Sequence, residues 1–298
     1  MKKFIPITIL LLFIFSCSKT QLDEINIQEK KIILNNSNLS NRIDNSNIGV
    51  ISIKEAPIEN PGGISSKTNT LNKVNSSDVA SNIPLSLIAE VSAPVYEGNT
   101  LRATHVAVNG DFVYVSYNVE GSQYLGGIDV VNISDPTKPF VELEAILPQT
   151  DISSVSYFNN KLYLAGASTS IEIDDSNPAL LISMDLSNGL PTDSFNLVDL
   201  SSYVATDILA NSSGVYVTSG DNGDLVKYDI TSNKIEYKVP IDDLRSIGSY
   251  KNKIFALSGS EGVSIYNETN LNLISNFSTN NNIAESKRTL DFFENNVL

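Results

Sequence analysis

A repeat of about 40 to 50 residues constrains this chain more than any other feature of its sequence. Each copy has an aliphatic residue, a polar turn, and then an apolar pair whose second member lies eight places after that aliphatic residue. The second members are Tyr114, Tyr163, Tyr216, Phe255 and Leu298, and the aliphatic residues are Val106, Val155, Ile208, Ile247 and Leu290. Four copies are complete and a fifth begins. A period of this length with several strands per unit is typical of a radial β-array.

Each repeat reads as four short strands separated by turns such as Asn-Gly and Asp-Asn-Gly, which tolerate positive φ in tight hairpins. In the first repeat we expect strands at His105–Val108, Phe112–Tyr117, Gly127–Ile133 and Phe140–Ile146; in the third, at Asp207–Ala210, Val215–Thr218, Leu225–Ile230 and Ile235–Val239. The sequence therefore predicts an all-β fold over residues 85–298. It is a β-propeller with four-stranded blades, of which four and the start of a fifth are present.

The segment from Gly127 to Pro136 reads Gly-Ile-Asp-Val-Val-Asn-Ile-Ser-Asp-Pro and is followed by Pro139. It resembles the LVIVD repeat of Bacteroidetes-type lipoproteins, with an asparagine at 132 where the usual form has aspartate. The other repeats keep reduced versions of the element. The resemblance covers residues 100–298 and implies a surface propeller without an assigned chemistry. From the residues themselves, we expect a role in fixing the turn after the third strand for Asn132, Asp185, Asp229 and Asn267.

Residues 1–16 have the layout of a secretory signal peptide. Lys2 and Lys3 precede an apolar run, Phe4 to Phe15, that is too short to span a bilayer. The run ends at Cys17, the single cysteine of the chain. The stretch Ile14-Phe15-Ser16-Cys17 resembles a bacterial lipobox, which implies acylation of Cys17, for example by palmitate. We expect Cys17 to anchor the protein to the outer membrane at the cell surface; a buried or incidental cysteine is the alternative.

Residues 17–84 are polar and rich in Asn and Ser, and the sequence predicts a flexible tether. Ser18 to Glu24 carries a small acidic pair, which resembles a surface-export signal but equally fits a solvated tether. The whole chain has a formal charge of −14. Loss of residues 1–16 removes two lysines and no acids, which makes it −16. A domain this acidic repels nucleic acid, so no nucleic-acid partner is expected.

The chain is poor in catalytic residue types, since it has one histidine, no tryptophan and no cysteine after Cys17. His105 occupies a repeat position that is polar in every copy and is otherwise filled by Ser154, Asp207, Ser246 and Thr289. That column suggests a wet channel or the loop side of the propeller. His105 is then either a binding imidazole or one more polar residue in the column.

The connections between blades carry charges of both signs that would converge on the channel mouth. We expect binding residues at Arg102, His105, Asp151, Asp207, Arg245 and Arg288, with a solvated rim as the alternative. No cofactor is expected except Ca²⁺. An acidic insertion in the second repeat offers oxygen ligands for it at Glu172, Asp174, Asp175 and Asn177.

Together these features predict a membrane-anchored surface lipoprotein whose propeller is a non-catalytic scaffold for a protein or a glycan. The alternative is a propeller enzyme of the cell envelope, a hydrolase or lyase assisted by carboxylates or a metal. A purely structural envelope protein is a third class. The fifth repeat stops at Leu298, and Ser86–Val91 reads as the outermost strand of a closing blade. We therefore expect a fragment of a longer reading frame with six to eight blades.

Overall fold

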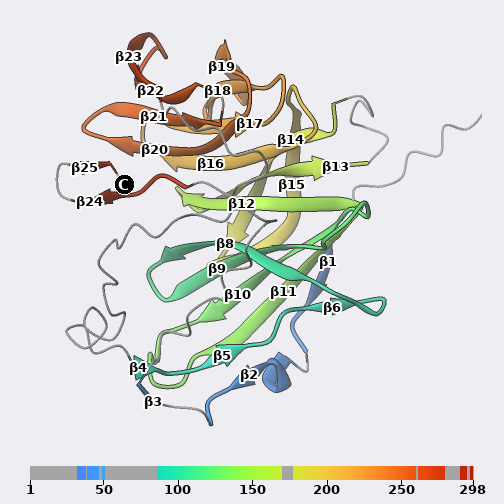
Figure 1. Cartoon of the computed structure of the whole chain (residues 1–298). Helices are drawn as coiled ribbons and strands as arrows, with labels where there is room; N and C mark the ends of the chain where they lie inside the picture. The colour runs from blue at the N-terminus through green and yellow to red at the C-terminus, as the bar shows by residue number, and fades with distance from the viewer. Residues whose placement is uncertain are drawn as a thin grey trace, which may run out of the picture.

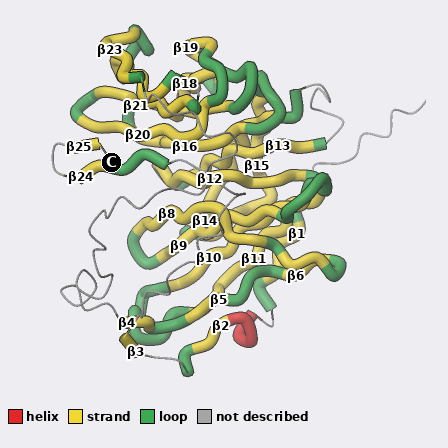
Figure 2. Tube along the Cα trace, in the orientation of Figure 1, coloured by secondary structure: helices red, strands yellow, loops and turns green. Residues whose placement is uncertain are grey.

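The computed structural model describes residues 32–37, 39–46, 49–50, 86–169, 177–259, 261–278, 289–293 and 296–297. Strands dominate this part of the chain (Figure 2). The one helical element within it is a single 3-10 turn, η1, at Leu39–Arg42. No helix among the described residues has the length and apolar character needed to cross a bilayer. The predicted signal peptide and Cys17 lie outside the described residues.

Four antiparallel sheets follow one another along the chain, and in each the four strands of one repeat lie in sequence order. They lie side by side from β8–β11 to β20–β23 (Figure 1). We refer to them as blades 1 to 4. The strands are β8 Arg102–Asn109, β9 Phe112–Asn118, β10 Leu125–Asn132, β11 Phe140–Pro148, β12 Thr150–Phe158, β13 Lys161–Ser168, β14 Ala179–Ser187, β15 Leu190–Asp199, β16 Ala205–Asn211, β17 Gly214–Ser219, β18 Asp224–Asp229, β19 Lys234–Pro240, β20 Leu244–Tyr250, β21 Lys253–Ser258, β22 Gly262–Asn267 and β23 Leu273–Phe277. The predicted all-β propeller of four-stranded blades is confirmed.

The start of a fifth unit is a short hairpin of β24, Phe292–Phe293, and β25, Asn296–Val297. Phe292 packs edge-on against Phe255, with ring centroids 5.2 Å apart. Beside this hairpin, the face of blade 4 that points away from blade 3 contains an apolar cavity of about 580 Å³. Phe277 on its edge is 60% exposed.

Apolar side chains form one cluster between each pair of neighbouring blades. The repeat anchors Tyr114, Tyr163 and Tyr216 are fully buried, one in each cluster. Two of them also bond to the next blade: the Tyr114 hydroxyl donates to the Gly189 carbonyl at 3.0 Å, and the Tyr216 hydroxyl to the Glu268 carbonyl at 2.6 Å. The repeated tyrosine thus joins one blade to the next through both packing and a hydrogen bond.

The predicted turn-fixing role is confirmed for three of four residues. The Asn132 side chain accepts the Ser134 N–H at 2.9 Å, Asp229 accepts two backbone N–H groups, and Asn267 accepts the Thr269 N–H at 2.9 Å. It is wrong for Asp185, whose carboxylate binds Lys161 and the Ser194 hydroxyl. Blade 2 makes this turn with a two-residue Asn-Gly loop at positive φ, which leaves no backbone N–H to cap.

Part of the segment predicted as a tether is folded onto blade 1. Strand β1, Ile33–Asn35, pairs with the outermost strand β11, so that blade 1 has five strands. Strand β2, Ile43–Asp44, follows η1. Apolar residues drive this contact, because Leu39 packs against Val131 and Val141. The expectation of a tether over all of residues 17–84 is therefore wrong for residues 32–46.

The segment Ser86–Val91 also differs from its prediction as one outermost strand. It forms two short strands, β4 Ser86–Leu87 and β5 Glu90–Val91. These pair with β3, Gly49–Val50, and with β2, rather than with the β24–β25 hairpin. Val91 packs against the same apolar cluster as Leu39. The partner of this segment is the N-terminal part of the chain, which the repeat pattern alone could not indicate.

A buried ion pair fixes the N-terminal segment in place. The Arg42 guanidinium donates to both oxygens of Asp129, at 2.5 and 2.8 Å, and to Glu144 at 2.8 Å. It also donates to the Ser92 carbonyl at 2.6 Å. The Asp129 side chain is fully buried and that of Arg42 is 15% exposed. Burial and the nearby Asp129 raise the pKa of Tyr117 above its ordinary value.

Replacement of Arg42 by Ala should lower the free energy of unfolding by about 3 kcal/mol, because Asp129 is then left buried without a cation. Urea unfolding of the purified chain measures this. The control is Arg102→Ala in the same blade. The side chain of Arg102 is 46% exposed and pairs with Glu120 at 3.6 Å. Its loss should change stability by no more than about 1 kcal/mol. Equal effects of the two substitutions would contradict the proposed importance of the buried pair.

Candidate functional site

The innermost strands of all four blades surround one cavity of about 550 Å³. Its walls come from β8, β12, β16 and β20, together with Thr289 and Leu290. We call this cavity the funnel. Four of the six predicted binding residues lie in its lining: Arg102, His105, Asp207 and Arg245.

A β-bulge recurs at the same repeat position in each innermost strand. The register shifts between Ala103 and His105 in β8, and at the matching places in the other three blades. A bulge re-aims the side chain of the extra residue and twists the strand. The bulged residues are Thr104, Ser153, Thr206 and Arg245. All four line the funnel or bond across it.

Asp207 connects three blades. One carboxylate oxygen accepts the Ser154 hydroxyl of blade 2 at 2.8 Å and the Ile208 N–H at 2.9 Å. The other accepts the Ser246 hydroxyl at 2.8 Å and the Ile247 N–H at 3.0 Å, both from blade 4. A carboxylate has about four lone-pair positions, and four donors occupy them here. Asp207 therefore works as a brace between blades.

Smaller contacts extend this bracing around the funnel. The Thr104 hydroxyl donates to the Ile152 carbonyl at 2.9 Å, which joins blades 1 and 2. The Thr206 hydroxyl donates to the Leu244 carbonyl at 3.0 Å, which joins blades 3 and 4 in the same way. In each pair, the carbonyl belongs to the residue just before the next bulge.

These bonds explain the polar column seen in the repeat. All five of its members line the funnel, as a wet channel requires. The column is polar because Ser154, Asp207 and Ser246 bond to one another from blade to blade, and the Leu290 N–H donates to the Ser246 hydroxyl at 3.1 Å.

His105 also joins two blades through one ring nitrogen, and its other ring nitrogen can bind a ligand. Its Nδ1 lies 3.0 Å from the Val155 carbonyl of blade 2. A carbonyl can only accept, so Nδ1 carries the proton and donates. In the neutral ring, Nε2 is then the acceptor nitrogen. The side chain is exposed on the funnel wall and can offer this nitrogen to a ligand.

Two guanidinium groups belong to the funnel, each beside a carboxylate. Arg102 lies 3.6 Å from the exposed Glu120, and the Arg245 Nε donates to Asp243 at 2.5 Å. The funnel thus combines charges of both signs, as predicted. The pair with Glu120 leaves Arg102 several N–H donors for a ligand, since a guanidinium has five.

The remaining two predicted binding residues are not part of this lining. Asp151 lies between blades 1 and 2, where its carboxylate accepts the Leu125 N–H at 3.0 Å. Burial raises the pKa of Asp151 to about 6, partly offset by backbone N–H groups of Leu125 and Val119. Arg288 lies outside the described residues.

Most of the predicted Ca²⁺ site also falls outside them, namely Glu172, Asp174 and Asp175. Asn177 is described, and its side-chain oxygen accepts the Ser202 N–H at 3.2 Å. Within the part of the chain that the structure describes, no group of three or more His, Cys, Asp or Glu side chains is arranged to hold a metal ion.

The bulged hydroxyl residues were missed as functional positions by sequence reasoning. Thr104, Ser153 and Thr206 occupy the first position of the aligned repeat segments, so the signal was present. The alignment shows a small polar residue there in three copies and arginine in two, but it does not show that the strand bulges at this position.

Comparison with known proteins adds an architectural likeness. No protein-family model matches the chain, and no curated protein matches its sequence. Among solved structures, AztD of Citrobacter koseri is 17% identical; the match covers 66% of this chain and 50% of that one, with a TM-score of 0.41. BamB of Moraxella catarrhalis is 14% identical, over 72% and 60% of the chains, with a TM-score of 0.46. The computationally designed protein Ika8 is 13% identical, over 70% of each chain, with a TM-score of 0.42.

The chain thus spans half the length of the AztD chain. At these identities and TM-scores, the matches carry no functional argument. The propeller architecture rests on the four sheets themselves, and the function has to be argued from the funnel and the surfaces around it.

Asp151→Asn should stabilise the protein at pH 7 by about 1 kcal/mol, because it removes a partly buried ionised carboxylate whose unfavourable burial is screened in part by solvent. The folded-state pKa of Asp151 is raised from 3.8 to about 6, so the folded state binds the proton more tightly than the unfolded state does. Relative to the variant, the wild type should therefore gain stability as pH falls from about 6 to 4. Urea unfolding at pH 4, 5, 6 and 7 measures both.

The control is Asp193→Asn, a change at an exposed aspartate of blade 2. It should leave the pH profile of stability as it is in the wild type. An Asp151→Asn profile that coincides with the Asp193→Asn profile would refute the assignment.

Proposed function

We propose that this chain is a lipid-anchored envelope protein whose propeller binds a partner without catalysis, and that the funnel takes an extended protein segment. The anchor in this proposal is Cys17, in line with the resemblance of residues 14–17 to a lipobox and of residues 100–298 to LVIVD-repeat lipoproteins. The outer membrane and the cell surface are the proposed location. The funnel is the observation that carries the binding role.

The chemistry of the funnel favours a polypeptide partner. Arg102 supplies N–H donors, Arg245 adds a positive charge, and Nε2 of His105 supplies an acceptor. An extended segment presents backbone N–H and C=O groups in alternation, which match the donors of Arg102 and the acceptor of His105 along strand β8. Aliphatic residues such as Val106 and Ile208 also line the cavity and give apolar contacts between these polar groups.

The state of the titratable groups supports a role in binding rather than catalysis. Asp207 already accepts four hydrogen bonds, so it has no lone pair free to take a proton from a substrate. His105 is oriented by a backbone carbonyl, whereas the base of a hydrolytic triad is oriented by a carboxylate. In the funnel, Asp207 therefore has a structural role, and His105 is oriented to bind a ligand rather than to act as a base.

The folded N-terminal segment shortens the proposed tether. Blade 1 holds the chain from β1 onward, and the described part begins at Ile32. Fifteen residue steps separate Cys17 from Ile32, and a chain of that length reaches at most about 50 Å when fully extended. A propeller anchored through Cys17 would thus stay close to the membrane surface.

Crosslinking in cells that produce the chain tests this proposal. The wild-type chain and a Cys17→Ala form are compared with the double variant Arg102→Ala/Arg245→Ala, and captured proteins are identified by mass spectrometry. We expect wild type to fractionate with membranes and to crosslink to a defined protein. Cys17→Ala should be released from membranes, and the double variant should lose the crosslink. Purified partner should bind the double variant about tenfold more weakly than wild type, a loss near 1.4 kcal/mol.

The control is Lys251→Ala/Lys253→Ala, which removes two positive charges from the exposed β20–β21 turn of blade 4. It should crosslink as the wild type does. Equal loss of partner in both double variants would attribute binding to net charge and contradict a role for the funnel. Membrane retention of Cys17→Ala would contradict the anchor.

A further inference from the structure

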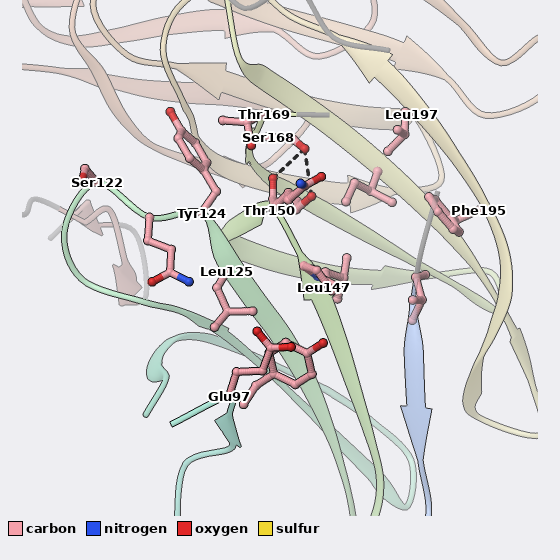
Figure 3. Close-up of a pocket in the computed structure, with 16 residues that line it drawn as sticks. Glu97, Ser122, Tyr124, Leu125, Leu147, Thr150, Ser168, Thr169, Phe195 and Leu197 are labelled. Atoms are coloured by element: carbon pink, nitrogen blue, oxygen red, sulfur yellow. Dashed lines mark hydrogen bonds between the residues drawn. The ribbon is translucent and has the colours of Figure 1, made fainter. Parts of the chain in front are cut away.

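A second cavity, of about 590 Å³, lies between blades 1 and 2, away from the funnel. Its walls are the β6–β7 hairpin (β6 Val95–Tyr96, β7 Asn99–Thr100), the loop before β10, the Gln149 connection and the outermost strand β15. Figure 3 shows Tyr124 on one side of it and Phe195 and Leu197 on the other, with Thr150 and Ser168 between them. We call this cavity the side cleft. Its volume is typical of small-molecule sites, which range from about 300 to 1,000 Å³.

The side cleft has an apolar floor and a polar mouth. Leu147 and Ile182 form the floor and belong to the buried cluster between blades 1 and 2, against which Phe195 and Leu197 also pack. Aromatic rings and neutral hydrogen-bonding groups line the mouth: Tyr96, Tyr124, Gln123, Gln149, Ser122 and Thr169. Half-buried Tyr96 and Tyr124 offer ring surface to a ligand, and the amides offer both donors and acceptors.

Hydrogen bonds fix the wall beneath Gln149. Its carbonyl accepts the Ser168 hydroxyl at 2.8 Å and the Thr169 N–H at 3.1 Å, and the Thr150 hydroxyl donates to Ser168 at 3.0 Å. These bonds hold Gln149 at a φ of 62°, in the left-handed region. Gln149 is the single residue between β11 and β12, so its position is set by both blades. The backbone at Gln149 is therefore fixed before any ligand arrives, which lowers the entropic cost of binding at this part of the mouth.

Charge narrows the class of ligand. Among the described residues that line the side cleft, no lysine or arginine occurs and Glu97 is the one carboxylate. The chain as a whole carries −14. Anionic ligands are therefore disfavoured. A single exposed carboxylate at the rim would bind a cation only weakly. A neutral ligand that has many hydroxyl groups and also an apolar face fits the amides, the hydroxyls and the rings together.

We infer that the side cleft binds a neutral saccharide, with a sugar ring against Tyr124 and its hydroxyls on Gln149 and Gln123. This site is separate from the funnel, so the inference does not depend on whether the funnel binds a protein. The saccharide-binding role goes beyond the proposed function because it adds a second ligand of a different class.

Isothermal titration calorimetry of the full chain tests this. The probes are neutral trisaccharides built from glucose, mannose, galactose or N-acetylglucosamine, with oligogalacturonate as the acidic arm and glucosamine oligomers as the basic arm. We expect at least one neutral probe to bind and both charged arms to bind more weakly. Tyr124→Ala should weaken the neutral probe by about tenfold. The control, Tyr203→Ala, removes a tyrosine that is 65% exposed elsewhere and should bind as the wild type does.

A second variant separates binding from folding. Gln149→Gly removes the side chain but suits the left-handed backbone, so it should unfold at the same temperature as the wild type or higher. It should still bind the neutral probe more weakly. Three results would each overturn the inference: no binding of any neutral probe, tighter binding of a charged arm, or binding that is unchanged in both Tyr124→Ala and Gln149→Gly.

Discussion

The inner edge of each innermost strand is the constraint on which the rest of the structure depends. A propeller brings four such edges together around a channel, and an unpaired edge exposes backbone N–H and C=O groups. Here side chains of the same or of a neighbouring blade satisfy several of them. Asp207 accepts the amides of Ile208 and Ile247, and the Ala210 N–H donates to the Ser156 hydroxyl at 3.0 Å. The polar funnel is thus first a means of joining blades, and the groups that remain free in it are those available for binding.

The outward apolar faces of blades 1 and 4, at the two ends of the array, are covered to different extents. On blade 1, Leu39 and Val91 cover an apolar patch, and the Arg42–Asp129 pair secures the N-terminal segment there. On blade 4, the apolar face that points away from blade 3 meets Thr289, Leu290 and the β24–β25 hairpin among the described residues, and Phe277 stays exposed. The N-terminal segment therefore acts as part of the propeller domain, and it brings the proposed anchor close to blade 1.

The amino-acid sequence was sufficient to predict those features of the fold that recur in every repeat. The tyrosine anchors and most turn-fixing residues recur at fixed positions, so aligned copies reveal them. It was insufficient for contacts made once between distant segments. Arg42 and Asp129 are 87 residues apart, and no copy of their pair exists elsewhere in the repeats for comparison. The same holds for the side cleft, because its mouth combines a hairpin, a loop and a blade connection that have no shared sequence pattern. The polar column was visible, but its cause, a chain of bonds through Asp207, depends on distances between blades.

Native-state hydrogen exchange at Ile208 and Ile247 tests the central claim most directly. Both amides donate to Asp207. The account predicts that in the wild type they exchange as slowly as amides of the second strands, and that Asp207→Ala frees both while β17 stays protected. Rapid exchange of the two amides in the wild type, or protection that survives Asp207→Ala, would contradict the claim that this carboxylate holds the blades together.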